Sequence, residues 1–199
     1  MSVVRPLALT AALATIVGLR WGLALGLPGE GLLVGLVFGG ALLAAAIAGG
    51  WHLGRTHVRS GRGLRVSAAP LAARVGAGIA VGLLLVALAM LVGRDQLPAL
   101  RPAAPFLPWI AITTLVATAE EIALRGALFG ALEDTAGPAA AILVTSAVFA
   151  LMHLPFYGWQ ALPLDLGVGL VFGGLRLASG GIAAPAVAHV IADAATWWL

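Results

Sequence analysis

The sequence contains no cysteine and few charged residues, and both absences restrict what the protein can be. Without cysteine there are no disulfides, no thiolate metal ligands and no cysteine nucleophile, so any chemistry must come from His, Asp, Glu, Ser or Thr. Only 10% of the 199 residues are charged and 61% are hydrophobic, whereas about a quarter of the residues in a soluble domain are charged. We therefore interpret the chain as an integral membrane protein surrounded by the lipid bilayer.

Lysine is absent as well, so every basic residue is an arginine. The 11 arginines stand against 8 acids, which leaves a formal net charge of +3. A handful of arginines explains the high isoelectric point without a basic nucleic-acid-binding face. We expect no nucleic-acid partner.

A membrane-crossing helix needs about 18–20 mainly apolar residues, and six to seven stretches of the sequence meet this length. They lie near residues 6–26, 31–50, 74–93, 107–130, 139–157, 163–178 and 180–198. Ser179, Gly180 and Gly181 leave almost no loop between the last two, so whether these two spans are separate stays open. The predicted fold is all-α, a polytopic membrane bundle of six to seven transmembrane helices. A signal peptide is the alternative for the first stretch, but no small-residue cleavage site ends it.

A basic segment between the second and third stretches predicts the orientation. It contains five arginines and no acid: Arg55, Arg59, Arg62, Arg65 and Arg74. By the positive-inside rule this loop is cytoplasmic, and the N-terminus with Arg5 is then cytoplasmic too. A contact with anionic lipid or protein is the alternative use of these arginines. We expect a multi-pass protein of a bacterial cytoplasmic membrane.

Other ionisable residues lie near the predicted span ends or in the basic segment, where contact with water is expected. They are Arg20, Asp95, Asp165, Arg176, His52 and His57. The long stems of Arg20 and Arg176 predict that both guanidinium groups reach the membrane interface.

Six ionisable residues remain inside predicted spans, where each costs about 2.5–3.5 kcal/mol to insert. They are Glu120, Glu121 and Arg125 on one helix, His153 on the next, and His189 and Asp193 on the last. At about 100° per residue, Glu121 and Arg125 share a face and can form an ion pair, while Glu120 points elsewhere. Asp193 has the same spacing from His189 and can meet its ring. Such residues can simply fasten helices, but six of them on three helices favour a functional polar cavity.

One carboxylate and two imidazoles are suited to activating water. Glu120 would act as general base, and the histidines would relay a proton or stabilise an oxyanion. Zinc held by Glu120, His153 and His189 is the second chemical interpretation, although the compact H-E-x-x-H spacing is missing. Ser146 precedes His153 by seven residues, a poor arrangement for serine catalysis. A non-enzymatic role in binding or proton-coupled transport is the alternative to catalysis.

Three motifs follow one another in the second half of the chain. Residues 120–125 fit E-E-x-x-x-R, residues 149–153 fit F-x-x-x-H, and residues 189–193 fit H-x-x-x-N/D. In this order and on predicted membrane helices, they resemble the CPBP family of intramembrane proteases. This family includes the type II CAAX prenyl endopeptidases and the bacteriocin-processing or Abi proteins. The resemblance covers about residues 110–196.

The resemblance implies a catalytic helical core over residues 107–199, preceded by membrane helices and the basic cytoplasmic loop over residues 1–106, within one membrane domain. It also implies a cavity that opens to the cytosolic side and an endopeptidase that acts on membrane-associated peptide or protein substrates. A glutamate mechanism without a cofactor is favoured, and zinc is the alternative.

The resemblance also implies a role for each motif residue. Glu120 would activate water with His153, and His189 and Asp193 would line the oxyanion side. The supporting residues would be Glu121, Arg125 and Phe149. Eukaryotic members of the family have Asn where this chain has Asp193, and an ionised Asp cannot donate a hydrogen bond to an oxyanion. Either Asp193 carries a proton, or it orients His189, which then donates alone.

Overall fold

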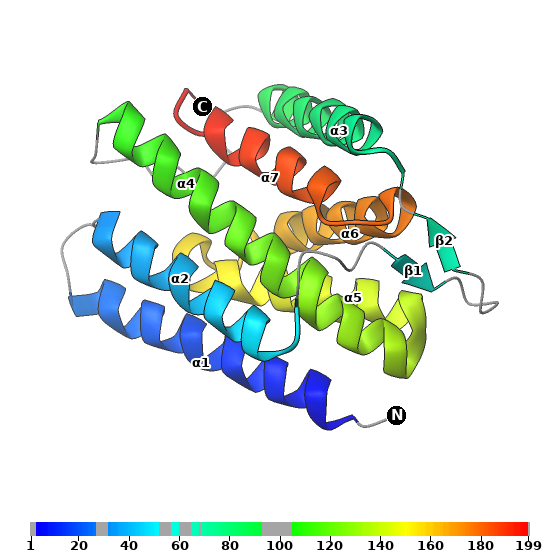
Figure 1. The fold of residues 1–199 in the computed structure, drawn as a ribbon. Helices are drawn as coiled ribbons and strands as arrows, with labels where there is room; N and C mark the ends of the chain where they lie inside the picture. The colour runs from blue at the N-terminus through cyan, green and yellow to red at the C-terminus, as the bar shows by residue number, and fades with distance from the viewer. Residues whose placement is uncertain are drawn as a thin grey trace.

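The computed structural model describes residues 3–26, 32–51, 57–59, 65–67, 69–92 and 105–198. Within these ranges the chain forms a bundle of helices with one short β-hairpin beside it (Figure 1). The helices are α1 (Val4–Gly26), α2 (Leu32–Ala48), α3 (Leu71–Val92), α4 (Phe106–Glu121), the π-helical turn η2 (Ile122–Leu128), α5 (Phe129–Tyr157), α6 (Leu162–Ser179) and α7 (Ala183–Ala195). The predicted all-α bundle is confirmed.

Helix α4 runs through the middle of the bundle, with α2 on one side and α7 on the other (Figure 1). Helix α1 packs against α2, and α3 packs against α7, so these five helices follow one another across the molecule. Helices α5 and α6 pack against each other and lie behind α4 in this view. The predicted site residues therefore come from α4, from the turn that follows it and from helices that surround it.

Among the described residues, four helical segments are long and apolar enough to cross a membrane: residues 4–22, 71–91, 106–155 and 162–179. The third extends over 50 residues and covers the predicted span 107–130 and most of the predicted span 139–157. Helices α2 and α7 are apolar but shorter, with 17 and 13 residues. Helices α6 and α7 are separate, because Gly180 ends α6 in the left-handed conformation at φ 73°. A glycine is favoured there because it has no Cβ to clash.

The predicted turn at residues 133–138 is a kink within α5. Gly137 has φ 87° and ψ 171°, and Pro138 follows it. Proline lacks the N–H that would continue the helical ladder, so the chain changes direction at this point. The helix on the N-terminal side extends several residues further than the predicted span.

The basic segment forms a two-stranded antiparallel hairpin, which the all-α prediction did not include. Strand β1 (His57–Arg59) pairs with β2 (Arg65–Ser67), and Val58 lies opposite Val66. In Figure 1 the hairpin lies at the same end of the bundle as the N-terminus. The predicted roles of His52, Arg55, Arg62 and Asp95 lie outside the described residues.

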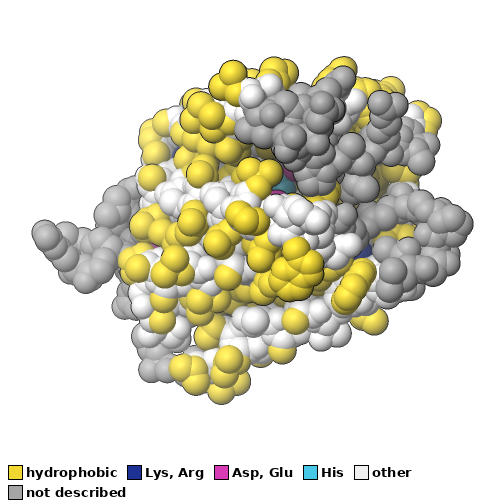
Figure 2. Space-filling model, turned by 180° about the vertical axis from the view of Figure 1, so that it is seen from behind, with side chains coloured by type: hydrophobic (Ala, Val, Ile, Leu, Met, Phe, Trp, Pro, Cys, Tyr) yellow, Lys and Arg dark blue, Asp and Glu magenta, His cyan; other side chains and the backbone are white. Residues whose placement is uncertain are grey.

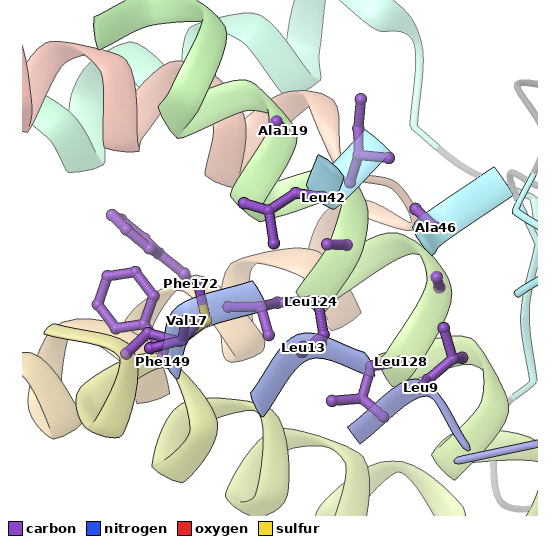
Figure 3. Close-up of a cluster of buried hydrophobic side chains, with 14 of the residues drawn as sticks. Leu9, Leu13, Val17, Leu42, Ala46, Ala119, Leu124, Leu128, Phe149 and Phe172 are labelled. Carbon is purple, nitrogen blue, oxygen red and sulfur yellow. The ribbon is translucent and has the colours of Figure 1, made fainter. Parts of the chain in front are cut away.

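The core contains leucine, alanine and phenylalanine side chains from α1, α2, α4, η2, α5 and α6 (Figure 3). Leu13, Leu42, Leu124 and Leu128 are at most 1% exposed. The outer surface is also largely apolar (Figure 2), with exposed leucines such as Leu83, Leu91 and Leu107. A surface of this kind is suited to contact with lipid rather than water.

Close packing between α3 and α7 gives a test of the fold. A methyl group on Gly78 would lie 2.5 Å from the carbonyl oxygen of Ala184 and 2.8 Å from Cβ of Val187. Because the two helices would have to separate, we expect Gly78→Ala to lower the free energy of unfolding by about 1–3 kcal/mol. Thermal unfolding in detergent measures the change.

Gly76→Ala is the matched control, since no atom lies within 4 Å of the added methyl group. This variant should unfold at or slightly above the wild-type temperature, because alanine favours helix. Equal unfolding temperatures for the Gly78 and Gly76 variants would contradict the close α3–α7 contact.

Candidate active site

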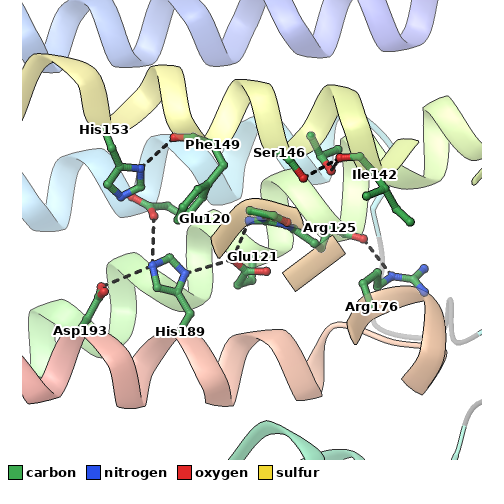
Figure 4. A network of polar contacts seen from close by, with 12 residues as sticks. Glu120, Glu121, Arg125, Ile142, Ser146, Phe149, His153, Arg176, His189 and Asp193 are labelled. Atoms are coloured by element: carbon green, nitrogen blue, oxygen red, sulfur yellow. Dashed lines mark hydrogen bonds and ion pairs between the residues drawn. The ribbon is translucent and has the colours of Figure 1, made fainter. Parts of the chain in front are cut away.

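A buried ion pair between Glu121 and Arg125 lies at the centre of the polar site (Figure 4). Nη1 of Arg125 donates to Oε1 of Glu121 at 2.8 Å, and both side chains are fully buried. Nη2 of Arg125 donates to the carbonyl oxygen of Gly169 on α6 at 3.2 Å. The guanidinium group also lies 4.7 Å from the centre of the Phe149 ring on α5. The predicted ion pair is present, and it connects α4 and η2 to α5 and α6.

His189 connects the two adjacent glutamates to α7. Its Nδ1 atom lies 3.0 Å from Oε1 of Glu121. Its Nε2 atom lies 3.5 Å from Oδ2 of Asp193 and 3.8 Å from Oε2 of Glu120. Glu120 and Glu121 therefore face opposite nitrogens of one imidazole ring, which separates their roles.

His153 presents its outer nitrogen to the same space. Its Nδ1 atom lies 2.9 Å from the backbone carbonyl oxygen of Phe149, one turn earlier. Because a carbonyl oxygen only accepts, Nδ1 carries the proton, and Nε2 of the neutral ring has the free lone pair. Ligand atoms of Glu120, His153 and His189 all lie within 4.8 Å of one another. The structure thus brings together residues of α4, α5 and α7, as the sequence predicts.

These three side chains also have the chemistry of a zinc site. Two imidazoles and one carboxylate match a common donor set of catalytic zinc. The Nδ1 atoms of His153 and His189 are held by a carbonyl and a carboxylate oxygen, which is how outer partners orient histidine ligands. Zinc holds nitrogen and oxygen ligands at about 2.0–2.2 Å, so the side chains would close slightly around an ion. The donor set therefore fits zinc as well as water.

The π-helical turn η2 follows Glu121 directly and was not predicted. Its backbone hydrogen bonds connect residues five apart instead of four, as seen where the N–H of Phe129 donates to the carbonyl oxygen of Leu124. The return to α-helical spacing leaves one carbonyl without a backbone donor. The carbonyl oxygen of Arg125 accepts a hydrogen bond from Nε of Arg176 at 3.0 Å.

The prediction that Arg176 extends to the membrane interface is wrong. Its side chain is only 4% exposed, and its guanidinium group lies 5.2 Å from the centre of the Phe129 ring. The free carbonyl of η2 provides a buried partner that sequence spacing does not reveal. Arg176 thereby secures the segment that carries Arg125.

Two more charged residues extend toward the site from outside the motifs. Arg20 of α1 lies 4.2 Å from the centre of the Phe38 ring on α2 and within electrostatic range of Glu120. Asp165 lies in the first turn of α6, within electrostatic range of His153. Its Oδ2 atom is buried and forms no hydrogen bond to the described residues. Both were expected at the interface, and neither is simply an interfacial residue.

Tyr157 also belongs to the site, although it lies outside all three motifs. Its ring is nearly parallel to that of His153, with an angle of 8° and a distance of 5.7 Å between centres. The only sequence signal for it is its position one helical turn after His153.

The site is reached from the side of Asp193. The side chain of Asp193 is 42% exposed, whereas those of Glu120 and His189 are 6% and 3% exposed. Figure 2 shows acidic and histidine atoms through a small opening beside apolar atoms. Asp193 lies near the end of α7 and Tyr157 ends α5, away from the hairpin and the N-terminus (Figure 1). The hairpin and the open side of the site thus lie at different ends of the bundle. If the hairpin is cytoplasmic, the site does not open to the cytosol, so these two predictions exclude each other.

Residues 102–195, just under half of the chain, match the family model described as Type II CAAX prenyl endopeptidase Rce1-like. These residues form an Rce1-like segment. The predicted resemblance to the CPBP family is thereby confirmed, and the family is one of CAAX-type endopeptidases. The Rce1-like segment contains α4 to α7 with all three motifs. No curated protein and no solved structure matches the chain. The division at residues 106 and 107 stays a prediction.

The buried ion pair gives a test of how the Rce1-like segment is held together. Arg125→Met would remove the guanidinium group from the buried Glu121 carboxylate and leave only His189 in contact with it among the described charged residues. We expect this variant to lower the free energy of unfolding by about 3–5 kcal/mol. Unfolding of the purified protein in detergent measures the loss.

Replacing both partners, Glu121→Gln with Arg125→Met, leaves no unpaired charge and should recover part of the lost stability. A double variant as unstable as Arg125→Met alone would show that the unpaired carboxylate is not the cause.

Proposed function

We propose that the protein is an intramembrane endopeptidase that hydrolyses peptide bonds of membrane-associated peptide or protein substrates. The observation that carries this proposal is the convergence of Glu120, His153 and His189 within 4.8 Å. The Rce1-like match supports the reaction class, since the residues that converge all lie within the matched residues 102–195. The apolar surface and the long helices support a location within the bilayer.

In the proposed mechanism, Glu120 and the free Nε2 atom of His153 hold one water molecule. Glu120 accepts a proton from this water as its oxygen adds to the carbonyl carbon of the substrate. The carbonyl oxygen becomes an oxyanion on the side of His189 and Asp193. The C–N bond then breaks, and Glu120 returns the proton to the amine. Each turnover consumes one water and releases one carboxylate and one protonated amine, the second proton of the amine coming from the hydroxyl of the new carboxylic acid.

The surrounding contacts explain why Glu120 rather than Glu121 would be the base. Both charged partners of Glu121, Arg125 and His189, contact its Oε1 atom at 2.8 and 3.0 Å. Glu120 has no contact shorter than 3.8 Å to the described charged groups. A carboxylate that is not held by close cationic partners can accept a proton from water more readily.

Glu120→Gln tests the proposal, because glutamine keeps the shape of the side chain but cannot accept the proton. The probes are an internally quenched farnesylated peptide with a CAAX tail and fluorescently labelled casein, both in detergent micelles. We expect cleavage by the wild type and a loss of about 10²- to 10⁴-fold in the variant. Mass spectrometry of the products identifies the cleaved bond.

Asp134→Asn is the matched control, since it removes a carboxylate from α5 beyond the π-helical turn, away from the site. This control should cleave as the wild type does. Undiminished cleavage by Glu120→Gln would contradict the proposal. Proton uptake into liposomes that depends on Glu120, without cleavage of either probe, would replace it by proton-coupled transport.

Metal removal tests whether the water is held without an ion, as we propose. Treatment of active protein with 1,10-phenanthroline, followed by metal analysis, should leave the cleavage rate unchanged. A rate that falls and returns on addition of zinc would assign Glu120, His153 and His189 to the metal instead. In that case the ion would supply the activated water, and Glu120 would be a ligand.

A further inference from the structure

Tyr157 is the single tyrosine of the chain, and it lies at the edge of the site that substrate can reach. It ends α5, one turn after His153, and the two rings are stacked. A helical side chain is directed back toward the preceding turn, which places the phenol ring over His153. The stacked ring therefore forms one wall of the space that His153 faces.

The phenol of Tyr157 lies within electrostatic range of charged groups on four other helices. They are Asp193 on α7, Glu120 on α4, Asp165 on α6 and Arg20 on α1. The hydroxyl forms no hydrogen bond to any described residue. A neutral O–H donor near this many charged groups, without a partner of its own, is positioned to bind a further acceptor.

Few side-chain donors can reach an oxyanion next to the reacting water. Arg125 is fully buried, including its Nε atom, which has no partner among the described residues. Nδ1 of His153 is bound to a carbonyl oxygen, and an ionised Asp193 only accepts. Nε2 of His189, 3.5 and 3.8 Å from two carboxylates, is then the one donor of the motif residues on the oxyanion side. A second donor there would strengthen the stabilisation of the oxyanion.

We propose that Tyr157 is a further catalytic residue whose hydroxyl donates a hydrogen bond to the substrate carbonyl oxygen as it becomes an oxyanion. This inference rests on the proposed endopeptidase function. The O–H bond stays intact, so the proton count of the hydrolysis does not change. The phenol supplies the donor that Asp193 lacks, on the side of the site that is open.

Tyr157→Phe removes the hydroxyl and keeps the stacked ring. With the farnesylated CAAX peptide as probe, we expect kcat to fall by about 10²- to 10³-fold, as for loss of one oxyanion donor. KM should change little, because the hydrogen bond strengthens only in the transition state. Thermal unfolding in detergent should match that of the wild type.

The second variant, Asp193→Asn, separates catalysis from structure. Its amide N–H can donate to the oxyanion in place of the phenol. The effect of Tyr157→Phe is therefore measured twice, once with Asp193 and once with Asn at that position. We expect the penalty to shrink to less than about tenfold in the Asn background, because a second donor is then present.

An equal penalty in both backgrounds would overturn the inference, since a structural role of the hydroxyl does not depend on a donor at position 193. A wild-type rate for Tyr157→Phe would overturn it as well. Both results would leave the proposed function intact as long as Glu120→Gln is inactive. The endopeptidase proposal itself would fail on a different result, namely wild-type protein that cleaves neither probe.

Discussion

The buried contact between Glu121 and Arg125 is the interaction on which the rest of the site depends. Two charges in a bundle surrounded by lipid are costly unless they are paired. Only Oε2 of Glu121 and Nε of Arg125 have no hydrogen-bond partner in this pair among the described residues. Here one carboxylate oxygen receives both Arg125 and His189, while the guanidinium group also binds the Gly169 carbonyl and covers the Phe149 ring. Four helices thereby meet at one ion pair. Its geometry fixes the direction of Glu120, the residue beside it.

Much of this site follows from spacing in the sequence. The i,i+4 intervals predict the Glu121–Arg125 pair and the approach of Asp193 to His189, because helical geometry alone decides which residues share a face. The helices were predicted for a similar reason, since length and apolar composition are local properties. The contact between α4, α5 and α7 was inferred from the cost of placing six ionisable residues within the membrane.

The features that escaped prediction depend on tertiary packing. The side chain of Arg176 is buried because it binds a carbonyl that becomes free only where η2 is π-helical. No residue type in the sequence predicts that turn. Arg20 and Asp165 could extend toward water or toward the protein, and neighbouring helices decide between these directions. Tyr157 carries no motif, and only its stacking on His153 identifies it. Local patterns thus predict which residues meet along one helix, whereas packing decides what long or flexible side chains reach.

The π-helical turn makes the length of one apolar segment as important as its composition. Between Glu121 and Phe129 the backbone contains one residue more than α-helical spacing would require, and Arg176 compensates for the carbonyl that this leaves over. Deleting a single residue there would remove the surplus and restore regular α-helical spacing, with the following helix kept in nearly the same rotational phase. The carbonyl oxygen of Arg125 would then regain a backbone donor, and Arg176 would lose its buried acceptor. Substitutions among the alanines and leucines that keep the length of this turn are therefore a milder change than a deletion, even though none of these residues takes part in the chemistry.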